Sequence, residues 1–179
     1  MMIPGLLTAP QWVLFVALVA ATFYADWKHR RVFDSITYSA LAAGLLVAAV
    51  WSVFIVQPPN PWWMPLTKSL AGAIFGFGIM YLLYVMGGVG GGDVKLMAAA
   101  GAVVGFPFIV EVLMYSTLVG LAVGLCAVIW AGKFKVLVRR TFSPKGLLRG
   151  QKLEESVQLV PFGMAFAGGS IWACLMYLQ

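Results

Sequence analysis

Charged side chains are scarce in this sequence. Only 10% of its 179 residues are Asp, Glu, Lys or Arg, whereas 62% are hydrophobic. A water-soluble domain carries about 25% charged residues, so this chain has too few charges to cover a surface that faces water. The scarcity excludes an ordinary soluble globular domain and favours a membrane protein.

Cysteine and histidine are almost missing as well. The chain has two cysteines, Cys126 and Cys174, and a single histidine, His29. Each cysteine lies inside an apolar run and no CxxC pair is present, so neither a disulfide framework nor a thiolate zinc site is indicated. We therefore expect no metal and no other cofactor. His29 lies in a basic run, where a solvated or headgroup-facing role is expected, so it does not support a Ser–His or Cys–His catalytic set.

Six apolar runs divide the chain, and a transmembrane helix needs about 20 residues. The runs cover approximately residues 7–25, 36–56, 67–86, a fourth from 94 that weakens at 105–107, a fifth that continues to 131, and 157–178. The fourth is too short to span a bilayer unless its start lies within the membrane, in a cavity lined by protein or water. The pattern predicts an all-α, polytopic membrane protein with about six transmembrane helices and a single domain over residues 1–179.

The basic residues predict the orientation of these helices. Of the 12 Lys and Arg residues, ten fall in the gaps after the first and fifth runs, Lys95 directly follows the gap after the third, and only Lys68 lies on the other side. The largest group lies in a polar segment at about residues 132–156. By the positive-inside rule these gaps are cytoplasmic, which places both termini outside. Cations beside a membrane also favour contact with lipid headgroups, so we expect membrane lipid and no nucleic acid as a partner.

Two aspartates are candidates for chemistry. Asp26 ends the first apolar run, and Asp93 closes the glycine-rich stretch that begins at Gly87. The predicted topology brings both to the cytoplasmic face at similar depth, where an acid is costly and is a functional candidate by default. Two carboxyls that meet can share a proton, one acting as general base on water and the other polarising a carbonyl group. The structural alternatives are an ion pair of Asp26 with Arg30 and a helix N-cap at Asp93.

The residues around both aspartates resemble a known family. Gly90-Gly91-Gly92-Asp93 matches the GxGD signature of intramembrane aspartic proteases, and its extension Val94-Lys95-Leu96 resembles the type IV prepilin peptidases. Asp26 with the basic stretch that follows it is similar to the family's first catalytic aspartate. Pro161-Phe162-Gly163 resembles a third family segment. The resemblance covers nearly the whole chain, with the segments in matching order.

The resemblance implies an intramembrane aspartic endopeptidase that cleaves the short basic leader from type IV pilin-like precursors. It implies action at the cytoplasmic face of the inner (plasma) membrane, with a prepilin as partner and no cofactor. Asp26 and Asp93 would be the catalytic pair, Gly90 and Gly92 would give the active-site loop its freedom, and Lys95 would be a topology anchor or a substrate contact. The chain is similar to the short, peptidase-only branch found in tight-adherence pilus systems, so no N-methyltransferase activity is expected.

One departure and two rival functions stay open. The family commonly has Ile-Pro-Asn where this chain has Val32-Phe33-Asp34, a change that bears on the local turn and on substrate preference. A proton- or ion-coupled transporter could use the two aspartates as relays, which predicts acids near the bilayer midplane. A non-catalytic assembly protein of a pilus or secretion system would need neither.

Overall fold

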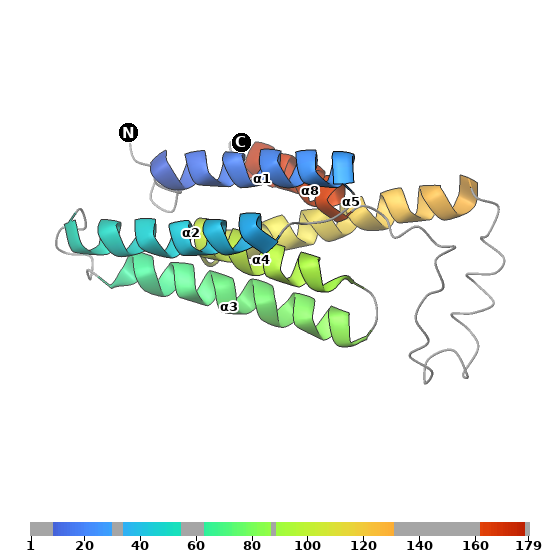
Figure 1. The fold of residues 1–179 in the computed structure, drawn as a ribbon. Coiled ribbons are helices and arrows are strands. Elements are labelled where there is room, and N and C mark those ends of the chain that lie inside the picture. Colours follow the sequence, from blue (N-terminus) through green and yellow to red (C-terminus); the bar gives the residue numbers. More distant parts are fainter. Residues whose placement is uncertain (1–8, 30–33, 55–62, 87–88, 131–161, 178–179) are drawn as a thin grey trace.

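The computed structural model of the protein describes residues 9–29, 34–54, 63–86, 89–130 and 162–177. Within these ranges the chain forms six helices and no strand, which confirms the predicted all-α fold (Figure 1). The helices are α1 (Ala9–His29), α2 (Asp34–Phe54), α3 (Met64–Val85), α4 (Gly91–Val104), α5 (Phe108–Trp130) and α8 (Phe162–Tyr177). The basic segment predicted at about residues 132–156 lies outside the described residues.

Two of the helices, α2 and α3, are long and apolar enough to cross a membrane. Shorter apolar stretches occur in α5 and α8, at Phe108–Gly124 and Gly163–Met176. Only 22% of the apolar window of α2, and the same share of that of α3, is buried inside the protein. Large apolar side chains therefore face outward, such as Ile74 and Leu82, which are 70% and 60% exposed. An apolar surface of this extent suits lipid rather than water, as expected of a polytopic membrane protein.

The helices alternate in direction, so their ends gather at two opposite ends of the bundle. At one end α1 finishes and α2, α4 and α8 begin (Figure 1). We call this the Asp93 end, because Asp93 lies in the first turn of α4. The other end holds the beginnings of α1 and α3, the end of α4 and the beginning of α5 (Figure 1).

The short helix α4 lies at the centre of the bundle. Ten of its fourteen residues are buried, and it packs against α1, α2, α3 and α5. Its backbone touches that of α3, since a Cβ atom on Gly72 would lie 2.3 Å from the carbonyl oxygen of Gly101. Gly76 approaches the Met97 carbonyl in the same way, and the small residues allow the two helices to pack closely. Neighbouring helices therefore cover α4, so a helix too short to span a bilayer does not have to expose its backbone to lipid.

Aromatic side chains join α1 to α5 and α8 on the other side of the bundle. The ring of Phe15 lies 6.3 Å from that of Phe108 and 6.5 Å from that of Phe166, both in edge-to-face geometry. Phe15 and Phe166 are almost completely buried. This packing holds α1 against α8 and brings the last turns of α1 to the Asp93 end, beside the first turn of α8.

Candidate active site

Asp26 is a buried carboxylate held by the start of α8. Its side chain is 5% exposed, and its Oδ2 atom accepts a hydrogen bond of 3.0 Å from the backbone N–H of Met164. Met164 is the third residue of α8, where backbone N–H groups have no partner inside the helix. The donor and the positive end of the helix dipole both stabilise negative charge on Asp26. The alternative partner, Arg30, lies outside the described residues.

Gly163 makes this contact possible. A Cβ atom at position 163 would lie 2.8 Å from Oδ2 of Asp26 and 2.9 Å from its Cβ atom, which is closer than real Cβ atoms approach. Sequence reasoning singled out Pro161-Phe162-Gly163 as a family-like segment but did not predict that it touches Asp26. The structure thus adds the first turn of α8 to the surroundings of the first aspartate.

Asp93 is the third residue of α4, and Gly90, in an extended conformation, is the N-cap. Asp93 is therefore not the N-cap residue that the structural alternative named, although its side chain closes a capping box with Gly90. Its Oδ2 atom accepts a hydrogen bond of 3.3 Å from the N–H of Gly90, while its own N–H donates to the Gly90 carbonyl oxygen at 3.1 Å. Gly92 was predicted to belong to the loop, but it is the second residue of α4, so of the two glycines only Gly90 precedes the helix.

The two aspartates come from helices that run in opposite directions and lie at the same end of the bundle. They are 67 positions apart in the sequence (93 − 26), yet both lie in terminal turns at the Asp93 end, on helices that pack against each other. Two carboxyls that come together at such a site resist ionising at the same time. A singly protonated carboxyl pair can act as an acid and a base at once.

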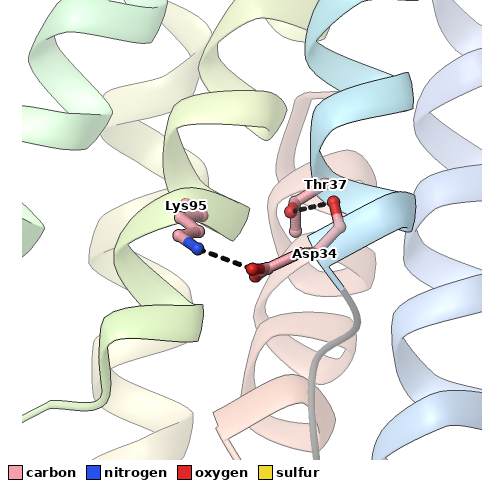
Figure 2. Close-up of polar contacts among 3 residues, drawn as sticks. All are labelled: Asp34, Thr37 and Lys95. Carbon is pink, nitrogen blue, oxygen red and sulfur yellow. Dashed lines mark hydrogen bonds and ion pairs between the residues drawn. The ribbon is translucent and has the colours of Figure 1, made fainter.

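The metal-ligating side chains of the described residues form no cluster of three or more. Lys95, the remaining candidate residue, has an ion-pair partner in the protein. Its ammonium group forms an ion pair of 2.9 Å with Oδ2 of Asp34, the first residue of α2 (Figure 2). The structure therefore assigns Lys95 a partner within the protein, on the helix that follows the first aspartate.

Comparison with known proteins decides the family. The model of the type IV leader peptidase family matches residues 12–125, a stretch that contains both aspartates. This chain belongs to the type IV leader peptidase family. It is 32% identical over 121 residues to a prepilin leader peptidase/N-methyltransferase of Bacillus subtilis. The matched stretch is 68% of this chain and 40% of that protein. A protein of the same name from Burkholderia pseudomallei is 33% identical over 118 residues, 62% of this chain and 35% of the relative.

The chain thus spans two fifths or less of the length of these curated relatives. No solved structure matches it.

Proposed function

We propose that this protein is an intramembrane aspartic endopeptidase that removes the leader from type IV pilin-like precursors. The observation that carries the proposal is that Asp26 and Asp93 lie in terminal turns of packed helices at one end of the bundle, with Asp26 buried against the start of α8. Membership of the type IV leader peptidase family supports the substrate class. The two relatives described above are named prepilin leader peptidases, and we extend that activity to this chain.

The pair can hydrolyse a peptide bond without any further group. The ionised carboxyl takes a proton from water, while the protonated one donates a hydrogen bond to the scissile carbonyl oxygen. Water adds to the carbonyl carbon, the C–N bond then breaks, and the leaving amine takes up the proton. Either aspartate can take either role in this scheme.

The substrate's position follows from the distribution of charge and apolar surface. We propose that its apolar segment lies in the bilayer beside the enzyme, while its short basic leader reaches the Asp93 end from the cytoplasm. Support comes from the cations in the gaps at this end and from the exposed apolar sides of α2 and α3. On this basis the protein lies in the inner (plasma) membrane, with membrane lipid around it and the active site on the cytoplasmic side.

The rival functions receive less support. A transporter relay would use acids near the bilayer midplane, whereas Asp26 and Asp93 lie in terminal turns of their helices. An assembly protein without activity would not require two carboxyls at one end of the bundle, nor a glycine that lets α8 approach one of them.

Co-expression with a candidate pilin-like precursor tests the proposal, with cleavage read as a mobility shift on a gel. Asp26→Asn and Asp93→Asn should each lower cleavage by about 10²–10⁴-fold or more, because neither carboxyl can do both tasks. Glu111→Gln is the matched control, since Glu111 lies in the first turn of α5 at the opposite end. Substantial cleavage by either Asn variant refutes the acid pair, and wild-type protein that cleaves no pilin-like precursor favours an assembly role.

A further inference from the structure

The first turns of α2 and α4 are tied together at the Asp93 end. The Nζ atom of Lys95 lies 2.9 Å from Oδ2 of Asp34 and 5.2 Å from the centre of the Tyr38 ring, one turn further along α2. Figure 2 shows the two charged side chains pointing toward each other from neighbouring helices. Lys95 thus receives both an ion pair and a cation–π contact from a single helix.

Asp34 is itself well placed to hold a cation. It is the first residue of α2, and Thr37 donates a hydrogen bond of 2.9 Å from its hydroxyl group to the Asp34 backbone carbonyl (Figure 2). A carboxylate in the first turn of a helix is stabilised by the helix dipole. The Thr37 side chain is 2% exposed, so this turn is packed into the bundle. The acid that Lys95 meets is therefore fixed to a rigid element.

The contact between Lys95 and Asp34 involves the same helical turn that carries Asp93. Lys95 follows Asp93 by two residues, and residues two apart on a helix point in different directions. The carboxyl of Asp93 contacts the N–H of Gly90, within its own turn. Lys95 joins this turn to α2 by a side-chain hydrogen bond, which acts beside the buried packing of Val94 and Leu96.

The two aspartates are held by different helices. Met164 of α8 holds Asp26, whereas α2 holds the turn of Asp93 through Lys95. Building on the proposed peptidase function, we propose that Asp34 and Lys95 are positioning residues that keep Asp93 at its working distance from Asp26. The side chains of Asp34 and Lys95 are 61% and 36% exposed. Exposed pairs stabilise a fold only slightly, so breaking this contact should cost little stability.

The proposal predicts which kinetic constant changes. With purified full-length enzyme and a pilin-like precursor in detergent, Lys95→Met and Asp34→Leu should each lower kcat by about ten- to a hundredfold with KM unchanged, because misplacement by about 1 Å costs about that much. The double variant should be no slower than the slower single variant, since both changes break one contact. Lys95→Arg and Asp34→Asn, which keep a donor and an acceptor oxygen, should remain close to wild type.

Lys68→Met is the matched control, because it removes an exposed lysine at the opposite end of the bundle, and it should leave kcat unchanged. All variants should insert and melt at temperatures close to wild type. Three results would overturn the proposal: unchanged kcat in Lys95→Met, multiplied losses in the double variant, or a raised KM with unchanged kcat. The last result would make Lys95 a substrate contact instead. Wild-type enzyme that does not cleave is a different outcome, because it refutes the peptidase function itself.

Discussion

Replacing Gly163 by alanine should displace Asp26 and slow catalysis. The added Cβ atom would lie 2.8 Å from Oδ2 of Asp26, whereas ordinary contact begins at about 3.4 Å. The two atoms must therefore separate by about 0.6 Å (3.4 − 2.8). The hydrogen bond from the Met164 N–H, which is 3.0 Å long, joins the same oxygen to the next residue and would be strained by the same movement.

The size of the effect follows from this displacement. Misplacement of a catalytic group by 1 Å costs about 10²-fold in rate, so a shift of about 0.6 Å should lower kcat by about tenfold or more. Overpacking typically destabilises a fold by about 1–3 kcal/mol, so Gly163→Ala should lower the melting temperature without preventing folding. KM should change little, because the new methyl group meets Asp26 and not the substrate.

The assay compares kcat and KM for precursor cleavage with the melting temperature in the same detergent. Gly78→Ala is the control, since nothing lies within 4 Å of a Cβ atom at that position of α3. It should retain wild-type kcat. Gly163→Ala that is folded and cleaves at the wild-type rate would show that Asp26 tolerates the displacement, and would refute its assignment as a carboxyl positioned by α8.

Three further outcomes follow from the sequence and the acid pair. A reporter fused after Lys145 should read cytoplasmic and one fused after Gln179 should read external; the opposite pair of results would place the acids on the wrong side for a cytoplasmic leader. Chelators should leave cleavage intact, and loss of activity that zinc restores would contradict a mechanism without metal. The product should carry an unmethylated N-terminus, and a methylated product found by mass spectrometry would contradict that expectation. The activity–pH profile should be bell-shaped, because an interacting carboxyl pair is active with one proton and inactive with none or two; a profile with a single ionisation would argue against shared protonation.

The helices were predictable because lipid-facing segments leave a long, unbroken apolar signal. The predicted run from 36 to 56 corresponds to α2, and the weakening at 105–107 marks the end of α4 at Val104. The placement of Asp26 and Asp93 at one end followed from the alternation of cations between gaps. The apolar runs and the cations between them can be read along the sequence, and the positive-inside rule connects them to topology.

The contacts around the acids were not predictable in the same way. Lys95 and Asp34 are 61 positions apart, and Met164 lies 138 positions from Asp26. No periodicity in the sequence specifies which helix faces which, or that a backbone N–H supplies the donor. Gly163 could be recognised in the sequence as part of a family-like segment. Its contact with Asp26 could not, because that contact depends on how α8 packs against α1 in the folded chain. Gly92 illustrates the converse, since glycine spacing suggested a loop where the helix had already begun.

The contact between α3 and α4 limits where a substrate helix can enter. A Cβ atom on Gly101 would lie 2.1 Å from the carbonyl oxygen of Gly72, so no side chain separates the two helices there. Sliding either helix would drive the Cβ atom of a neighbouring alanine into the opposing backbone. Any movement that admits a substrate segment, on the proposed function, would therefore have to keep α3 and α4 together as one unit.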